Sequence, residues 1–133
     1  MTEQKTSGSC LCGEVAFEIS GPMRPVVNCH CIQCRKQTGH FLAATDCAMD
    51  NFKFTNETGL KWYRASETAR RGFCGNCGST LFWQADNNQA KISIAAGAID
   101  GNSGLTTSGH IFVAWKGDYY DIPDYEAQHP ESD

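Results

Sequence analysis

The chain of 133 residues carries a formal net charge of −4 at pH 7, and hydrophobic residues make up 41% of it. This length suits a single domain with a real core and leaves little sequence for a second one. The slightly acidic balance, with no basic stripe interleaved with aromatic residues, argues against a nucleic-acid-binding protein.

The cysteines indicate the cellular compartment. The chain has eight of them, yet the polar residues 1–7 lack the basic and apolar regions of a secretion signal. The longest apolar stretches are strand-length, well short of the roughly 20 residues of a membrane span. We therefore expect a cytoplasmic protein, in which close cysteine pairs bind metal more often than they form disulfides.

In chain order, a polar tail over residues 1–7 is followed by a tight knuckle, Cys10-Leu11-Cys12-Gly13. Val15, Phe17 and Ile19 then alternate with other residues, which is the period-two pattern of a strand with one buried face. Gly21-Pro22 ends this strand, and residues 23–28 are predicted to form a second one. It leads into the cluster Cys29-His30-Cys31-Ile32-Gln33-Cys34.

Residues 31–39 are predicted to form one or two helical turns that place Cys31 and Cys34 on one face and stop at Gly39. Such turns would also aim backbone N–H groups at the sulfurs. Further strands are predicted at 41–48, 52–54, 60–64, 80–84, 91–97 and 110–115, and a second knuckle at 74–78. Residues 119–133 are polar and predicted to be draped or disordered.

These elements predict a mainly β fold, small and antiparallel, of about eight short strands tied by zinc knuckles. We expect one zinc-binding domain over residues 1–133, with its core at about 8–124. The three tryptophans, Trp62, Trp83 and Trp115, are predicted to be core residues. Exposed strand edges make a homodimer a further hypothesis.

Two cysteine pairs far apart in sequence make a complete set of four sulfurs, which we call the outer set: Cys10, Cys12, Cys74 and Cys77. Four thiolates close the coordination sphere of zinc and leave no position for water or substrate. The outer set is therefore predicted to hold a structural zinc. A rubredoxin-like iron site is the alternative, because iron accepts the same sulfurs.

Three more cysteines, the inner set, offer sulfur ligands within six residues: Cys29, Cys31 and Cys34. A vacant fourth position would let zinc activate a thiol or water, so the inner set is the candidate catalytic site. Alternatives are a fourth ligand from Cys47, a histidine or an aspartate, or a second closed structural zinc. Cys47 is otherwise interpreted as a small buried hydrophobe.

Other polar residues near the knuckles have two interpretations each. His30 lies between two ligands and is predicted to point away from the metal, whereas His40 and His110 are either proton carriers or packed residues. Four cations could hold substrate carboxylates or offset the charge of the zinc–thiolate clusters. They are Arg35, Lys36, Arg70 and Arg71.

Taken together, the stretches 8–17, 29–36, 73–79 and 110–112 resemble the glutathione-dependent formaldehyde-activating enzyme family. The resemblance spans about Gly8 to Asp124, with every cysteine motif in order. It implies a fold like that of the Mss4 group, built from antiparallel strands. It also implies two zinc ions per chain, a structural one on the outer set and a catalytic one on the inner set.

The activity implied by this resemblance is carbon–sulfur bond chemistry, in which glutathione and formaldehyde combine to S-hydroxymethylglutathione. We therefore expect a carbon–sulfur lyase whose partners are a small-molecule thiol and a small aldehyde. A non-catalytic zinc-stabilised binding module is the alternative, because one fold can serve several functions. Thiol redox chemistry at Cys47 or at an inner cysteine is a third hypothesis.

Overall fold

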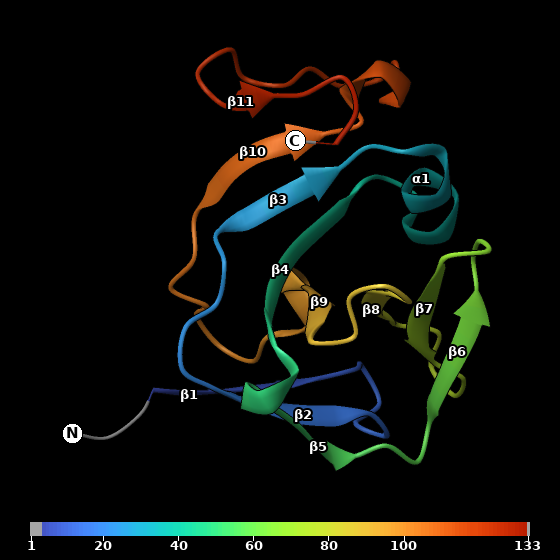
Figure 1. The fold of residues 1–133 in the computed structure, drawn as a ribbon, viewed down its shortest axis with the longest axis vertical. Helices are drawn as coiled ribbons and strands as arrows, with labels where there is room; N and C mark the ends of the chain where they lie inside the picture. The colour runs from blue at the N-terminus through green and yellow to red at the C-terminus, as the bar shows by residue number, and fades with distance from the viewer. Residues whose placement is uncertain (1–3, 133) are drawn as a thin grey trace.

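The computed structural model describes residues 4–132, and its strands form two sheets (Figure 1). The prediction of a mainly β fold is confirmed, since eleven strands accompany one α-helix and three short 3₁₀ turns in these residues. The helix is α1 (Ile32–Thr38), which begins after Cys31 and ends at Gly39 as predicted. No helix within the described part of the chain is long and apolar enough to cross a membrane.

The smaller sheet contains three strands in the order β1-β2-β5, paired antiparallel: β1 (Lys5–Ser9), β2 (Ala16–Ser20) and β5 (Phe52–Asn56). The predicted polar tail is wrong from residue 5 onward, because β1 pairs with β2 along its whole length; residues 1–3 lie outside the described part. An edge strand of this kind depends on backbone pairing, which leaves little hydrophobic periodicity in the sequence.

The larger sheet has eight strands in the order β11-β10-β3-β4-β9-β8-β7-β6. Neighbouring strands are antiparallel, as predicted, except that β10 runs parallel to both β3 and β11. The bounds are β3 (Val26–Cys29), β4 (Leu42–Ala48), β6 (Leu60–Arg64), β7 (Ala69–Cys74), β8 (Thr80–Ala85), β9 (Lys91–Ala95), β10 (Thr107–Ile111) and β11 (Ala127–Gln128).

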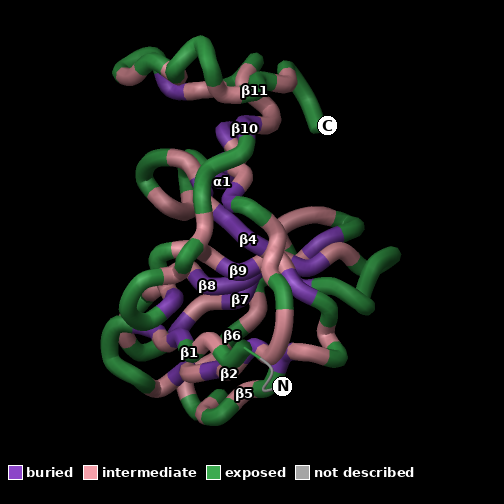
Figure 2. Tube along the Cα trace, turned by 90° about the vertical axis from the view of Figure 1, so that its left-hand side faces the viewer, coloured by how far each residue is buried: buried purple, intermediate pink, exposed green. Residues whose placement is uncertain are grey.

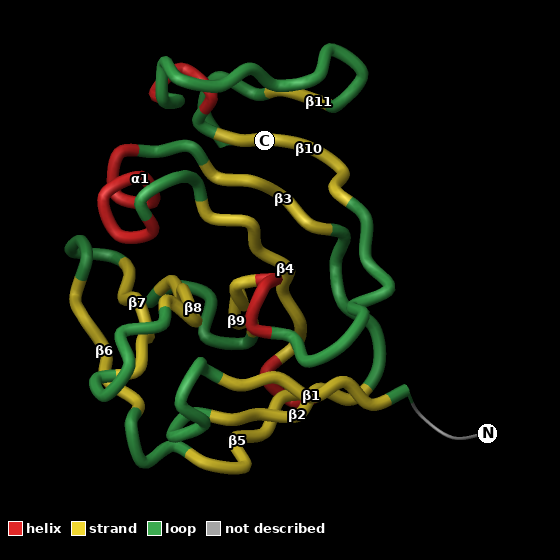
Figure 3. The backbone as a smooth tube through the Cα atoms, turned by 180° about the vertical axis from the view of Figure 1, so that it is seen from behind, coloured by secondary structure: helices red, strands yellow, loops and turns green. Residues whose placement is uncertain are grey.

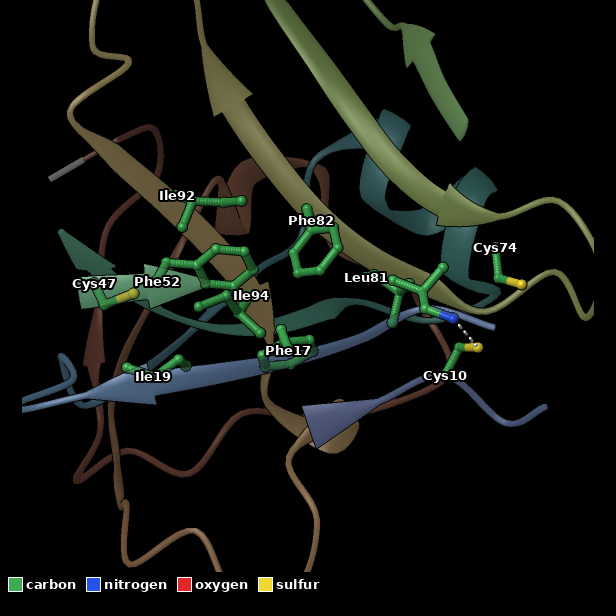
Figure 4. Packing of buried hydrophobic residues seen from close by; sticks show 11 residues of the cluster. Cys10, Phe17, Ile19, Cys47, Phe52, Cys74, Leu81, Phe82, Ile92 and Ile94 are labelled. Carbon is green, nitrogen blue, oxygen red and sulfur yellow. Dashed lines mark hydrogen bonds between the residues drawn. The ribbon is translucent and has the colours of Figure 1, made fainter. Parts of the chain in front are cut away.

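The main core lies between the small sheet and the central strands of the large one (Figure 2). Its centre is aromatic: the ring centroids of Phe17 and Phe52 are 5.4 Å apart, and those of Phe17 and Phe82 are 5.5 Å apart. Two outer cysteines, Cys10 and Cys74, lie at one end of this cluster, and Cys47 lies at the other (Figure 4). The outer set is thus continuous with the core.

Cys47 is confirmed as a small buried hydrophobe. Leu42 and Ala44 of β4 pack with the inner cysteines, whereas Cys47 packs in the main core. Because successive side chains of a strand point to opposite faces, an odd-numbered position such as 47 faces away from 42 and 44. Burial also raises the pKa of the Cys47 thiol to about 11. Cys47 is therefore no ligand of the inner set, and its burial disfavours the thiolate form.

The strand predicted over residues 110–115 is displaced toward the N-terminus and begins at Thr107. β10 ends at Ile111, Phe112 adopts the left-handed conformation with φ of 56°, and Val113–Trp115 form a 3₁₀ turn. This sharp change of direction turns the chain away from the sheet edge. A non-glycine residue at positive φ is uncommon and persists only where surrounding structure holds it.

The surrounding structure is the segment 119–132, which was predicted to be draped or disordered and is draped over the turn after β10. Three backbone N–H groups donate to it: Phe112 to Glu131 O at 2.9 Å, Val113 to His129 O at 3.1 Å and Ala114 to Pro130 O at 3.3 Å. β11 also extends the large sheet beside β10 (Figure 3). Backbone hydrogen bonds do not depend on apolar side chains, so a polar segment can be held in this way.

Candidate metal centres and the adjoining cavity

The outer set forms where two turns meet. The Sγ atoms of its four cysteines all lie within 4.8 Å of one another, although the two pairs come from distant parts of the chain. Gly13 and Gly78, each following one pair, adopt φ values of 86° and 81°, which glycine tolerates without a steric penalty. The Val15 N–H donates to Cys10 Sγ at 3.3 Å.

The outer set fits a tetrahedral zinc ion. Four sulfurs at a zinc–sulfur distance of about 2.3 Å lie about 3.8 Å apart. Cys12 Sγ lies 3.7 Å from both Cys10 Sγ and Cys74 Sγ, which agrees with this spacing. The Ser79 hydroxyl, 3.2 Å from Cys77 Sγ, lowers the pKa of that thiol to about 5 and so favours the thiolate that zinc requires.

The inner set assembles at the start of α1. Cys29 ends β3, Cys31 is the N-cap of α1 and Cys34 lies in its first turn, and the three Sγ atoms lie within 4.8 Å of one another. The Cys34 N–H donates to Cys31 Sγ at 3.3 Å, as the predicted helical turn requires. Hydrogen bonds from the neighbouring sulfurs, first that of Cys29, lower the pKa of Cys31. In residues 4–132 no fourth cysteine, histidine or carboxylate joins this set.

Arg71 of β7 is the cation that contacts the inner set. Its guanidinium is buried, with Nη2 3.4 Å from Cys34 Sγ and Nη1 2.9 Å from Gln37 Oε1. Arg71 thus offsets thiolate charge, which is one of its two predicted roles. The neighbouring Arg70 instead lies over the Trp62 ring, 3.8 Å from its centroid, and Arg35 donates to the Trp115 carbonyl.

Removing this cation is expected to weaken metal binding at the inner set. In Arg71→Met three thiolates lose the buried charge that partly balances them, so zinc affinity should fall about 10- to 100-fold, as is typical for partners of metal ligands. Competition with a chromophoric chelator measures this change. Arg70→Met is the matched control and should leave the zinc affinities of the inner set and of the outer set unchanged. Equal losses of inner-set zinc affinity in the two variants would contradict the role of Arg71.

The inner cysteines open into a cavity of about 610 Å³. Cys29, Cys31 and Cys34 all contribute to its lining, together with residues from β3, β4, β7, β8, β10 and the 3₁₀ turn that follows β10. The alternation of β3 explains this geometry, because Val27 and Cys29 face the cavity while Asn28 points to the opposite, buried face. The inner set is thus accessible from one side.

Trp83 and Trp115 line this cavity, so their prediction as core residues is wrong. Trp83 is only half-buried and Trp115 is 40% exposed, whereas Trp62 does pack against the main core. The sequence alone could not separate the core tryptophan from the two cavity tryptophans, because an aromatic ring suits a core and a ligand cavity equally well. Phe112, which belongs to the stretch 110–112 of the family resemblance, also lines the cavity, and no sequence pattern predicted that position.

The histidines lie away from the cavity. His30, which directly follows β3, is completely buried and does not line the cavity, so it points away from the inner set as predicted. Neither His40 nor His110 lines the cavity. The role of proton carrier in the cavity is therefore not supported for these residues. His40 instead contacts the Tyr119 hydroxyl at 2.7 Å on the exposed surface.

His30 and His110 belong to a buried hydrogen-bonded chain that ends in the segment 119–132. The Glu126 carboxylate can only accept, so His110 Nε2 donates to it at 2.8 Å. His110 Nδ1 then accepts from His30 Nε2 at 2.9 Å, and His30 Nδ1 accepts from the Tyr120 hydroxyl. Burial lowers the pKa of His30 to about 4, consistent with a neutral ring. This chain anchors the segment that supports the cavity wall.

Comparison with known proteins agrees with these clusters. The model of the glutathione-dependent formaldehyde-activating enzyme family matches residues 5–115. An uncharacterized lyase of Schizosaccharomyces pombe (strain 972) is 30% identical over 115 residues, which cover 86% of this chain and 83% of that protein. A Rhodobacter sphaeroides protein of known crystal structure shares the fold, with a TM-score of 0.60 at 22% identity, over 76% of this chain and 97% of that one.

Proposed function

The chain belongs to the glutathione-dependent formaldehyde-activating enzyme family, and on this premise we propose that it is a zinc-dependent carbon–sulfur lyase acting on a thiol adduct of a small aldehyde. One observation carries the proposal: the three inner sulfurs line a cavity, whereas the four outer sulfurs form a complete set beside the core. An incomplete ligand set beside a cavity is typical of catalytic zinc, and a complete one of structural zinc.

The proposed reaction is the reversible addition of a thiol to an aldehyde. The sulfur–carbon bond forms, the carbon–oxygen π bond breaks, and the thiol proton ends on the oxygen, so no oxidant or reductant is needed. Glutathione and formaldehyde are the reactants that the family's description suggests, and their adduct would be S-hydroxymethylglutathione. The reverse reaction releases the thiol and the aldehyde again.

Cys29, Cys31 and Cys34 would hold the zinc ion of this site. Such an ion supplies Lewis-acid chemistry, lowering the pKa of a bound thiol or polarising a carbonyl oxygen. Around it, the Cys34 N–H and the Arg71 guanidinium stabilise thiolate charge. Since no histidine lines the cavity, water or a lining hydroxyl such as that of Thr68 carries the proton to the oxygen.

We also propose a cytoplasmic location. Seven of the eight cysteines lie in the two clusters, and both clusters need reduced thiols to bind metal. We propose two zinc ions per chain, one for each cluster.

Native mass spectrometry of protein purified without chelators tests the proposed function. We expect two zinc ions per chain, and after addition of glutathione an adduct that is absent from the Cys31→Ser variant. Two zinc ions that resist competing thiols, with no adduct and no turnover of glutathione and formaldehyde, would contradict the proposal. That result would favour a non-catalytic zinc-stabilised binding module. The same spectra report whether the chain is a homodimer.

A further inference from the structure

The cavity beside the inner set is much larger than formaldehyde requires. Its volume of about 610 Å³ falls within the range typical of sites for small organic ligands. A water molecule, which has one heavy atom where formaldehyde has two, occupies only about 30 Å³ in the liquid. Formaldehyde alone would therefore leave most of the cavity to water, in a place where water competes with the thiol.

The walls of this cavity are mainly apolar. Aliphatic residues come from β3, β4 and β10, and three aromatic residues come from β8 and from the turn after β10. The apolar lining that the argument uses is Val27, Leu42, Trp83, Ile111, Phe112 and Trp115. Phe112 and Trp115 lie next to each other, with ring centroids 6.0 Å apart, on the turn that segment 119–132 holds in place. Such a wall favours an apolar group of several carbon atoms.

Both cations of the lining already contact protein groups through their Nη atoms, and only Arg71 Nε has no partner among the described residues. Arg24 Nη1 lies 3.1 Å from the Asp46 carboxylate, and its Nη2 donates to the Ala44 carbonyl at 2.9 Å. Arg71 is buried between Gln37 and Cys34. The two carboxylates of glutathione, placed among these walls, would share the single guanidinium donor that is free in the described part of the chain, Arg71 Nε, and burying a poorly paired charge is unfavourable. The charged groups of a thiol therefore do not belong in this cavity.

A second hollow of about 530 Å³ suits those charged groups better. It shares Ile32, Gln33 and Arg71 with the cavity. Lys36 and Gln37 also line it, and Lys36 makes no ion pair within the described residues. The two hollows thus adjoin through these shared residues, and the second one adds the cation Lys36.

We propose that the aldehyde accepted by this protein carries an apolar body, which occupies the cavity between Trp83 and Trp115 while the thiol's charged groups lie toward Lys36. The inference rests on the proposed function, because it assigns a substrate class to the same site. It follows that small aliphatic or aromatic aldehydes, and not formaldehyde, are the better substrates. The added carbons replace water along the apolar wall.

Binding of inert probes tests the apolar body without requiring turnover. Primary amides from formamide to hexanamide carry a carbonyl group and a lengthening chain, and emission from Trp83 and Trp115 reports their binding to the zinc-loaded protein. Burial of each methylene should tighten the dissociation constant about fourfold. A dissociation constant that does not change with chain length would overturn the proposal.

Variants of the wall separate cavity binding from surface binding. Ala44→Leu fills the cavity from β4 and should abolish the dependence on chain length, whereas Ala48→Leu, at the exposed end of the same strand, should preserve it. Trp115→Ala removes a partly exposed wall residue with little risk to folding and should weaken the dependence. An unchanged dependence in both Ala44→Leu and Trp115→Ala would overturn the placement.

Reaction assays assign the apolar group to the aldehyde and test the proposed function separately. We expect glutathione with butanal to react faster than glutathione with formaldehyde, and faster than butanethiol with formaldehyde, as measured by NMR exchange. A preference for butanethiol with formaldehyde would overturn the assignment to the aldehyde. Preference for glutathione with formaldehyde would overturn the apolar substrate while supporting the proposed function. If the dissociation constant of the amides fell steeply with chain length but no carbon–sulfur bond formation were catalysed, the proposed function would be refuted instead.

Discussion

Cys74→Ser is expected to prevent stable folding. Cys74 is completely buried at the end of β7, and its sulfur lies in the outer set, which joins the turn after β1 to the turn between β7 and β8. Structural zinc contributes on the order of 10 kcal/mol to folding, comparable to the whole stability of about 5–15 kcal/mol of a typical domain. Loss of one ligand should therefore shift the protein to the unfolded state at room temperature.

Circular dichroism with denaturant titration and zinc analysis measures this effect. Cys47→Ala is the matched control, since it removes a buried sulfur at the other end of the same core without touching either set. Its free energy of unfolding should fall by only about 1 kcal/mol, as is typical of single substitutions. If Cys74→Ser unfolded at the same denaturant concentration as this control, the structural role of the outer set would be wrong.

Cys31→Ser is expected to remove activity while leaving the fold intact. Cys31 is a ligand of the inner set and the N-cap of α1, and serine is itself a favourable N-cap, so the helix start is preserved. The inner set lies away from the main core. We expect the rate of thiol addition to fall at least about a hundredfold, since even partners of metal ligands reduce activity 10- to 100-fold.

Rates of exchange between thiol, aldehyde and adduct, measured by NMR, test this expectation. Zinc analysis should find one zinc ion per chain in the variant, and its unfolding midpoint should stay close to that of the unaltered protein. Loss of folding in Cys31→Ser would show that the inner set is structural. Retained activity with one zinc ion would show that the inner set is not the catalytic site.

Local features of the site were predictable from the sequence. The two knuckles and the helix from Cys31 to Gly39 depend on cysteine spacing and on one glycine stop, each within a few residues, and the number of cysteines in each motif gave the division into outer and inner sets. The strands around them showed clear alternation because one face of each packs in the main core. Such signals are local and survive in a single sequence.

The rest of the cavity depends on pairing between distant segments. The hydrogen bond from the Phe112 N–H to the Glu131 carbonyl and the pairing of β1 with β2 involve backbone groups, which every sequence carries. The position of Trp115 depends on the left-handed conformation of Phe112, for which the sequence holds no glycine as a signal. For these reasons the cysteines were predictable and the walls around them were not.

The support of the cavity wall by segment 119–132 also orders events during synthesis. Every ligand of both sets precedes residue 78, so both clusters can bind metal while the later strands are still being made. The carbonyls that hold the wall belong to residues 129–131, which follow several seconds later at roughly 5–20 residues per second. The metal-binding scaffold therefore becomes available first on the ribosome, and the substrate cavity is completed last.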